Sequence, residues 1–591
     1  MPESGFWCAL PDVTIAVVKN RLFRSPLVWP ASTVLAVMAA FVAVNPSLEM
    51  PINDDWGYAR MAQLFAATGR LQYDSWGSPM VGIHAIWGAL FIKIFGFSFT
   101  LLRFSTAVTA SGCALVCHAI CRRLGLSPAM SAFTAMTLML SPLTIAMTAT
   151  FMTDLTGLFL VLVLLYGALG CAQAETDARC MVWLFAIVCA GVLACSVRQV
   201  LILPAVSVVA SVMVLRWRSR RILLAGLCAL LCVGACAEAM LKWLYSQPGA
   251  MHDLLSLPAL SWPQAVWSTH MIVFSALTVV ALALPILGSA LAIPAVWKRA
   301  GTIALPVTAI VLAIGCFKPR IVLPPWLGNV VSKYGALPPN IGILGVRPVV
   351  LPAEARVIFA VVMYLAASLV AGVAFYALRD RFRAFDWRRL SLPGGPGLTL
   401  AVIVLPAAGL YSAAILGRNM ADWYVFDRYL LPLIGCLLPA LAFLHHSLIS
   451  PRITRIGWLL LVFSAALGIA MTHDQIAGNR ATLAAADRLT AAGIPRTCFS
   501  AGYEYDAWTQ LVSQGYIAKA KLVFLKQVHP RFWFELCAPA IDPCYYVVLS
   551  PQAGLMPSDF KPVRYTTWLS PRQRELSIQR NPQCNTRSCA R

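Results

Sequence analysis

The chain has 591 residues, of which 59% are hydrophobic and only 12% are charged. A soluble globule of this size needs more charged groups to cover its surface, so the composition excludes a soluble protein. The formal net charge of +22 does not indicate a nucleic-acid partner, because the basic residues fall in short clusters between apolar runs, as at 216–221 and 379–389. Such clusters are typical of the cytoplasmic loops of a membrane protein.

Mostly apolar windows recur along the chain at close to the length of about 20 residues that a membrane-spanning helix requires. They predict an all-α polytopic membrane protein with about thirteen transmembrane helices. The windows are 27–44, 101–120, 129–149, 155–172, 181–197, 200–215, 222–241, 271–296, 302–316, 357–378, 398–417, 429–447 and 456–471.

The distribution of basic residues predicts the orientation of these helices. If residues 1–26 are cytoplasmic, about nineteen basic residues fall in cytoplasmic loops, against about thirteen in the longer loops of the opposite side. We therefore expect a multi-pass protein of the cell inner membrane, with its N-terminus in the cytoplasm and its C-terminus outside. Residues 27–471 form the predicted membrane domain.

Three segments are expected on the outer side of the membrane. Residues 45–100 form a first loop with an amphipathic helix (WGYARMAQLFAATG) and a second, semi-apolar stretch, whereas the Pro- and Gly-rich residues 317–355 favour an irregular loop. Residues 472–591 combine a helical pattern near 478–492 with strand-like runs, TCFSAG and YYVVLS. They predict a small extracytoplasmic α/β domain.

Five cysteines lie in the last hundred residues, on the side where disulfides can form. One plausible bridge joins Cys537 to Cys544, and the connectivity is open; the other three are Cys498, Cys584 and Cys589. The remaining cysteines are mostly single residues in apolar runs, which favours small hydrophobic groups over metal ligands.

Acidic residues are scarce in the membrane half, and most of them fall at the expected outer ends of spans. Asp54 and Asp55 follow the first window, Asp154 follows the third, and Asp422 and Asp427 precede the twelfth. Two adjacent carboxylates beside an apolar surface repel each other, so the pKa of one should rise, as general acid–base catalysis requires. The alternative is a cap for the helix beginning near Trp56. Taken alone, the pair leaves both interpretations open.

The surrounding motifs resemble those of a known superfamily. The run NDDWGYARMAQLFAATG follows the first window; LLRFST at 101–106, TFMTD ending at Asp154, SVRQV around Arg198 and FDRYLLPL at 426–433 come next, and the tail run AGYEYDAWTQL at 501–511 matches loosely. Together they resemble the GT-C superfamily of membrane glycosyltransferases. The nearest branch is the bacterial one related to protein mannosyltransferases and to the lipid A aminoarabinose transferase (glycosyltransferase family 39-like).

The resemblance implies an active site at the extracytoplasmic surface, in which a first-loop acid is the base towards an acceptor hydroxyl. By motif position Asp54 is that base, and Asp55 is its partner or a metal ligand. Many relatives have Asp-Glu where this chain has Asp-Asp, which puts the second role in doubt. Asp154 matches the second acidic position, where it would orient the acceptor or share a divalent metal ion with the first loop. The alternative for Asp154 is an N-cap of the next helix.

The resemblance also implies an anionic leaving group, so the site needs cations, and guanidinium groups suit phosphate well. Arg198, Arg428 and Lys242 are the candidates for donor phosphate binding, with snorkelling to lipid headgroups as the alternative for each. In the tail, Glu504 and Asp506 are candidates for acceptor binding, against the alternative of solvated loop charges.

We therefore expect an enzyme that transfers a sugar, with inversion, from a polyprenyl-phosphate donor to a lipid, an envelope glycan or a protein. A divalent metal ion held by Asp55 and Asp154 is one option for a cofactor. The alternatives are a transporter or lipid-linked-glycan flippase without transferase activity, and a catalytically inactive scaffold of the same fold. Charges avoid the span centres and the two halves are dissimilar, which disfavours the transporter.

Overall fold

The computed structural model describes residues 27–77, 79–250, 261–337, 343–383, 395–420, 425–515, 538–569, 573–584 and 589. The predicted cytoplasmic N-terminus, Asp422 and Cys537 lie outside these residues. The α-helices are α2 (Val28–Ala43), α3 (Asp55–Thr68), α4 (Gly82–Phe95), α5 (Phe99–Arg123), α6 (Pro128–Met139), α7 (Pro142–Thr148), α8 (Asp154–Gln173), α9 (Asp177–Val197), α10 (Ile202–Leu215), α11 (Arg220–Ser246), α12 (Trp262–Leu282), α13 (Leu284–Gly288), α14 (Pro294–Phe317), α15 (Pro319–Val322), α16 (Ala353–Arg383), α17 (Pro396–Met420), α18 (Leu431–Leu448), α19 (Arg455–Ala491) and α20 (Tyr503–Gln514). Short 3-10 helices are η1 (Gln199–Leu201), η2 (Ser289–Ala292), η3 (Asp427–Leu430) and η4 (Arg496–Cys498).

The predicted polytopic helical architecture is confirmed. Within the described residues, ten helices are long and apolar enough to cross a membrane, or up to eleven if α6 and α7 form one span bent by 68°. The bend falls where Ser141 caps α7 and Pro142 opens it, since proline cannot continue the preceding helix. Two more predicted windows correspond to the shorter apolar helices α2 and α10.

Helix starts are specified locally by short polar residues. A side-chain oxygen at the N-cap accepts the backbone N–H three residues later, which satisfies a donor that the helix itself leaves unpaired. This occurs at Ser98, Ser127, Ser141, Thr176 and Ser219. These five helices therefore begin where the sequence places a short polar residue before an apolar run.

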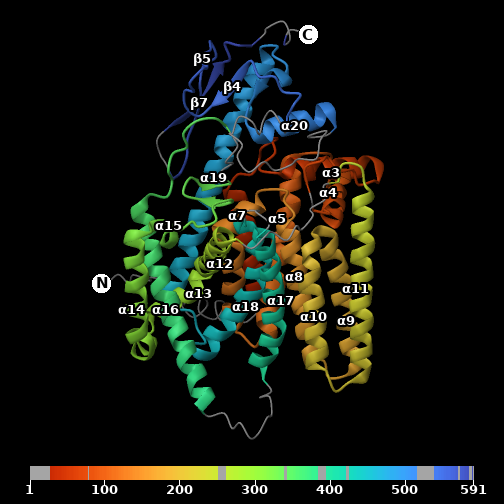
Figure 1. Cartoon of the computed structure of the whole chain (residues 1–591), viewed down its shortest axis with the longest axis vertical. Helices are drawn as coiled ribbons and strands as arrows, with labels where there is room; N and C mark the ends of the chain where they lie inside the picture. The colour runs from red at the N-terminus through yellow and green to blue at the C-terminus, as the bar shows by residue number, and fades with distance from the viewer. Residues whose placement is uncertain are drawn as a thin grey trace, which may run out of the picture.

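A small α/β domain covers one end of the bundle (Figure 1). Its sheet has the order β3-β4-β7-β5, with β6 also paired to β7; β3 and β4 are parallel and the other pairs are antiparallel. The strands are β3 (Phe499–Ser500), β4 (Tyr545–Val548), β5 (Met556–Pro557), β6 (Val563–Tyr565) and β7 (Arg574–Arg580), and a separate hairpin joins β1 (Val331–Ser332) to β2 (Gly335–Ala336). The predicted strands in TCFSAG and YYVVLS are confirmed as β3 and β4.

Helix α19 joins the bundle to this domain without a break. It runs from Arg455 to Ala491, so the helix predicted near 478–492 is a continuation of the last span rather than a separate element. Figure 1 shows α19 rising from the bundle into the sheet, with α20 lying across the top of α3 and α4. The domain therefore sits directly over the first loop.

Two disulfides join the segment that follows β7 to the starts of β3 and β4. Cys498 pairs with Cys589 and Cys544 pairs with Cys584, with Cα atoms 5.7 and 5.0 Å apart. Cys544 therefore pairs with Cys584 instead of with Cys537, the partner suggested from the sequence. Proximity in the sheet, which the sequence does not show, selects the partner.

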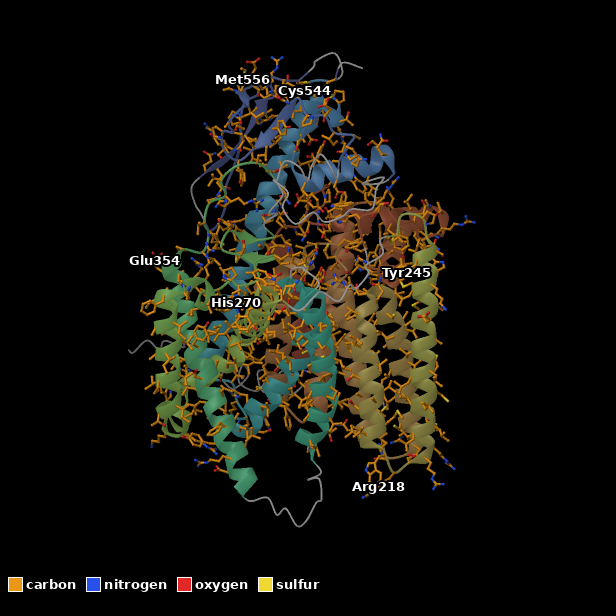
Figure 2. All side chains as sticks on the ribbon, in the orientation of Figure 1. Arg218, Tyr245, His270, Glu354, Cys544 and Met556 are labelled. Carbon is orange, nitrogen blue, oxygen red and sulfur yellow. A yellow bond between two sulfur atoms is a disulfide. The ribbon has the colours of Figure 1, made fainter. Side chains whose placement is uncertain are left out.

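The basic cluster at 216–221 and the C-terminal domain lie at opposite ends of the bundle. Figure 2 shows Arg218, from the basic cluster at 216–221, at the end of the bundle opposite to Cys544 and Met556 of the sheet, with Glu354 and Tyr245 on the domain side. The basic loop and the domain therefore occupy opposite ends, as the positive-inside pattern requires if the domain is outside.

Candidate active site

Two arginines hold the start of the first loop. Arg103, fully buried on α5, donates hydrogen bonds to the carbonyl oxygens of Pro46, Leu48 and Met50. Arg480 on α19 donates to the carbonyl oxygens of Ser47 and Asn45. These backbone groups lie in an irregular segment and have no helix or sheet to pair with, so the guanidinium groups fix the path of the chain toward residues 53–55.

Arg103→Met should lower the free energy of unfolding by about 2 to 3 kcal/mol, because buried carbonyl oxygens lose their donors. The measurement is chemical unfolding of the full chain in detergent. Arg60→Met is the matched control, since Arg60 is half-buried and bonds only to Gln63 in its own helix among the described residues. Equal stability of Arg103→Met and Arg60→Met would contradict the role given to Arg103.

The second acid of the Asp54–Asp55 pair is turned into the protein. Asp55 is fully buried, and its two oxygens accept hydrogen bonds from the backbone N–H groups of Ile52 and Phe151, at 2.7 and 3.2 Å. Burial raises the pKa of Asp55 to about 7, against the opposing charge of Arg103. Both oxygens are thus engaged in joining the first loop to residue 151. This geometry suits a positioning group; catalysis or metal binding by Asp55 stays a prediction.

Asp54 faces the opposite way, toward Arg428 of η3 and Tyr503 of α20. Its side chain is 18% exposed; one oxygen lies 3.2 Å from Nη2 of Arg428 and the other accepts a 2.7 Å hydrogen bond from the Tyr503 hydroxyl. Asp54 occupies the N-cap position of α3, but its side chain accepts no N–H of that helix. The alternative of a helix cap therefore does not account for this carboxylate.

Arg428 retains donors beyond its bond to Asp54. It belongs to η3, where its side chain is 6% exposed, and its Cζ lies 5.4 and 5.6 Å from the ring centres of Phe426 and Tyr429. Nη1 contacts only the Met152 sulfur at 4.0 Å, and Nε has no hydrogen-bond partner among the described residues. A buried guanidinium with unused N–H groups is suited to take an anionic oxygen.

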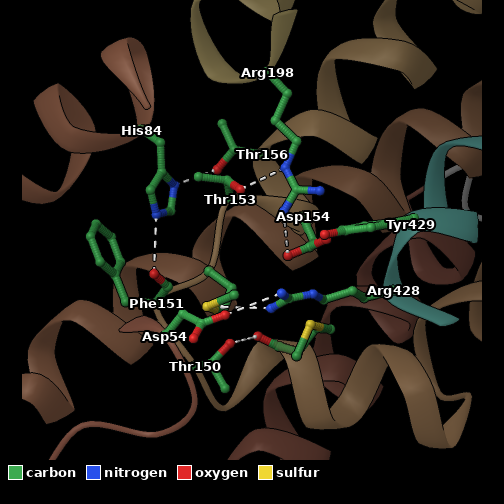
Figure 3. Close-up of polar contacts among 12 residues, drawn as sticks. Asp54, His84, Thr150, Phe151, Thr153, Asp154, Thr156, Arg198, Arg428 and Tyr429 are labelled. Atoms are coloured by element: carbon green, nitrogen blue, oxygen red, sulfur yellow. Dashed lines mark hydrogen bonds and ion pairs between the residues drawn. The ribbon is translucent and has the colours of Figure 1, made fainter. Parts of the chain in front are cut away.

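A second acid–arginine pair lies beside the first, as Figure 3 shows. Arg198 Nη2 lies 3.0 Å from Asp154, and Arg198 Nε donates to the Thr153 hydroxyl at 2.8 Å. Asp154 is the first residue of α8, one position beyond the N-cap at Thr153, where a negative charge also suits the helix dipole. The structure thus brings together Asp54, Asp154, Arg198 and Arg428 from four separate parts of the chain.

His84 supports the segment that carries Asp154. Its ring nitrogens lie 2.9 Å from the Thr156 hydroxyl and 3.4 Å from the Phe151 carbonyl oxygen, and its ring stacks on Phe151. Because Asp55 binds the N–H of the same Phe151, the turn before α8 is fixed from both sides.

The remaining predicted residues divide into those near this cluster and those away from it. Lys242 is exposed on α11 and pairs with Glu238 one turn earlier at 3.2 Å, so the structure does not bring it to the two pairs. Glu504 is buried at the edge of the cluster, where burial raises its pKa to about 7 against the opposing charge of Arg347 and the backbone N–H of Asn53. Contact of Glu504 with an acceptor stays a prediction.

Asp506, the other predicted acceptor ligand, is turned into its own domain. Its oxygens accept hydrogen bonds from the Ser500 hydroxyl and the Ala501 N–H, at 2.5 and 3.0 Å, and it is 2% exposed. This geometry ties the first turn of α20 to β3. A role for Asp506 at the acceptor stays a prediction, and the contacts favour a structural role.

Asp506 also gives the domain a pH dependence. Burial raises its pKa from the ordinary 3.8 to about 7, so the folded state binds the proton more tightly than the unfolded state does. The stabilising contribution is therefore complete below the unfolded pKa and is lost as pH rises through the folded value. We expect the unfolding temperature of the wild type to fall as the pH rises from about 4 to about 7. In Asp506→Asn the unfolding temperature should depend less on pH over the same range. A steeper fall in Asp506→Asn would contradict the assignment.

A shared metal ion was one option from the sequence. Within the described residues, the one group whose ligand atoms lie within reach of a single ion is Cys544, Cys584 and Cys589, and these sulfurs belong to the two disulfides. Both oxygens of Asp55 accept backbone N–H groups, whereas Asp154 contacts Arg198 through one oxygen and its other oxygen has no hydrogen-bond partner among the described residues. A divalent metal stays a prediction.

Sequence reasoning overlooked three residues that complete the cluster. Tyr503 donates to Asp54, Arg103 holds the first loop, and Arg347 faces Glu504. Tyr503 and Arg103 lie inside the quoted motifs AGYEYDAWTQL and LLRFST, which was the signal available. Scarce acids and cations at outer helix ends stand out in the sequence. The neutral hydroxyl of Tyr503 and Arg103, which lies inside an apolar helix, do not.

No protein-family model and no curated sequence matches the chain. Solved structures do resemble it. One is the protein O-mannosyltransferase Pmt1-Pmt2 complex of S. cerevisiae bound to the sugar donor, with 15% identity and a TM-score of 0.30 over 41% of this chain and 36% of that chain. Two are ArnT from Cupriavidus metallidurans. The apo form has 15% identity and a TM-score of 0.37 over 93% and 98% of the chains, and the form bound to undecaprenyl phosphate has 14% and 0.36 over 95% and 99%.

These solved structures are of the kinds of protein that the sequence motifs resemble. At this low identity and superposition the similarity carries no argument about substrate or catalytic residues. Those are argued from the two acid–arginine pairs.

Proposed function

We propose that this protein transfers a sugar from a polyprenyl-phosphate donor to an acceptor at the outer face of the cytoplasmic membrane. The acceptor is a lipid, an envelope glycan or a protein. One observation carries the proposal: the partly exposed carboxylate of Asp54 lies 3.2 Å from a buried arginine, Arg428, whose Nε has no hydrogen-bond partner among the described residues. A base and an anion-binding group side by side are what transfer from a phosphate-linked sugar requires.

In the proposed reaction, Asp54 removes the proton from the acceptor hydroxyl as its oxygen attacks the anomeric carbon. The new bond forms as the bond from that carbon to the phosphate oxygen breaks, and the phosphate keeps the electron pair. Attack from the face opposite to the leaving group inverts the anomeric carbon. The unused N–H groups of Arg428 stabilise the charge that develops on the phosphate.

The second pair has a supporting part in this proposal. Arg198 neutralises Asp154, and the pair places a second cation beside the donor phosphate while the carboxylate orients the acceptor. The orientation N-terminus inside and C-terminal domain outside belongs to the same proposal, supported by the basic loop at the end of the bundle opposite to the domain.

The test is a donor screen with the purified full-length protein. Undecaprenyl-phosphate sugars of defined structure are supplied one at a time with an envelope extract, and mass spectrometry follows the release of undecaprenyl phosphate and the mass gained by acceptors. We expect one donor class to be consumed with matched labelling of an acceptor. Movement of donors across liposome membranes without cleavage of the sugar–phosphate bond would contradict the proposal and favour a flippase.

A further inference from the structure

The contact between Tyr503 and Asp54 crosses from the C-terminal domain to the first loop. Tyr503 is the first residue of α20, and its hydroxyl lies 2.7 Å from the Asp54 oxygen that Arg428 does not contact. We propose that Tyr503 is a positioning residue for the base Asp54, so that the C-terminal domain completes the catalytic centre. This inference rests on the proposed function and deepens it.

The direction of the hydrogen bond follows from chemistry. An ionised carboxylate only accepts, so the Tyr503 hydroxyl donates to one oxygen of Asp54 while Arg428 donates to the other. Donors on both oxygens fix the carboxylate plane, whereas one donor leaves the group free to turn. The remaining lone pairs of Asp54 stay available for an acceptor hydroxyl.

Tyr503 is itself held by packing. Its ring lies 6.2 Å from the Trp56 ring and 5.8 Å from the Trp76 ring, and Trp56 is fully buried. These contacts involve the ring alone, so removal of the hydroxyl leaves them in place. A Tyr503→Phe substitution therefore removes the hydrogen bond to Asp54 and keeps these ring contacts.

The neighbouring residue makes a parallel contact. Glu504 lies close enough to Asn53, the residue before Asp54, for the Asn53 backbone N–H to lower the pKa of its carboxyl against the larger effect of burial. Asn53 has a φ of 57°, in the left-handed region that Asn tolerates better than most side chains, so this turn depends on outside contacts to hold its shape. Successive residues of α20 thus hold successive residues of the first loop.

Another function of the hydroxyl would give the opposite result. If Tyr503 only filled the place of the acceptor hydroxyl in the resting protein, its removal would open the site and raise the rate. A positioning residue gives a slower chemical step with little change in substrate binding, because the substrates do not touch it.

The experiment compares Tyr503→Phe with Tyr505→Phe in the full chain. Tyr505 lies on the same helix, but its ring stacks on Phe499 of β3, within the C-terminal domain. Tyr505→Phe therefore removes a hydroxyl from the same helix away from Asp54. With the donor selected by the screen, we expect Tyr503→Phe to lower kcat about tenfold, with KM for the donor and the acceptor changed by less than about twofold. Tyr505→Phe should retain the wild-type kcat.

Hydrogen exchange gives a second readout that needs no substrate. Backbone amides of residues 52–58 should exchange faster in Tyr503→Phe, with α20 itself unchanged, and should match wild type in Tyr505→Phe. An unchanged or raised kcat in Tyr503→Phe, or equal losses in both variants, would overturn the inference. If the wild type transfers no sugar at all, the proposed function fails, and unchanged exchange in Tyr503→Phe would then reject the contact as well.

Discussion

Asp54→Asn should reduce sugar transfer by about three orders of magnitude, within the usual range for loss of a general base. Asparagine has nearly the same shape, and its one oxygen can take the place of the oxygen that Arg428 contacts. Its NH2 group then faces the Tyr503 hydroxyl, which can turn to accept instead of donate, so the site should keep its shape. It cannot take the proton of the acceptor hydroxyl. The measurement is the initial rate of undecaprenyl phosphate release at equal protein amounts in the membrane.

Asp487→Asn is the control, because Asp487 is an exposed acid on α19 and the chemical change is the same. It should retain the wild-type rate. Full activity in Asp54→Asn would remove Asp54 as the base and leave Asp154 as the other carboxylate of the cluster.

Arg428→Ala should lower kcat/KM for the donor by about 100- to 1000-fold, as expected when a preorganised donor to a developing charge is removed. Arg428→Lys should recover part of the loss, since lysine keeps the charge but lacks the planar fork of N–H groups. The measurement is the dependence of the initial rate on donor concentration, with the acceptor held saturating.

Arg428 also positions Asp54, so the two losses should not multiply. The double variant Arg428→Ala with Asp54→Asn should be far more active than the product of the single effects predicts, because each substitution disrupts the same unit. Fully multiplicative effects, or an Arg428→Ala loss seen only in acceptor binding, would contradict the assignment.

The bundle was predictable because its signals are local. Apolar windows, polar caps and the breaker at Pro142 each act over a few residues, and the predicted amphipathic helix is present as α3, Asp55–Thr68. The acids at outer helix ends were found by their scarcity. The predicted topology placed these acids on one side of the membrane, because every second end of successive spans lies on the same side.

Two features of the site could not be predicted from the sequence. They are the directions in which side chains point and the contacts between residues far apart in the chain. Asp54 and Asp55 are adjacent, yet the turn at Asn53 sends one side chain toward Arg428 and the other toward Phe151. Lys242 was selected as a cation at an outer helix end, but its side chain is exposed on α11 and pairs with Glu238. Tyr503 reaches Asp54 across 449 positions, and no local pattern specifies that contact.

The uninterrupted α19 makes the outer domain a mechanical extension of the membrane bundle. At 1.5 Å per residue its 37 residues form a rod of about 55 Å, and a continuous helix has no hinge at the membrane surface. Because α20 is tied to the sheet beside this rod and Tyr503 reaches down to Asp54, a tilt of the rod in a thinner or thicker bilayer would be transmitted to the base. The thickness of the membrane would then bear on how Tyr503 is placed against Asp54.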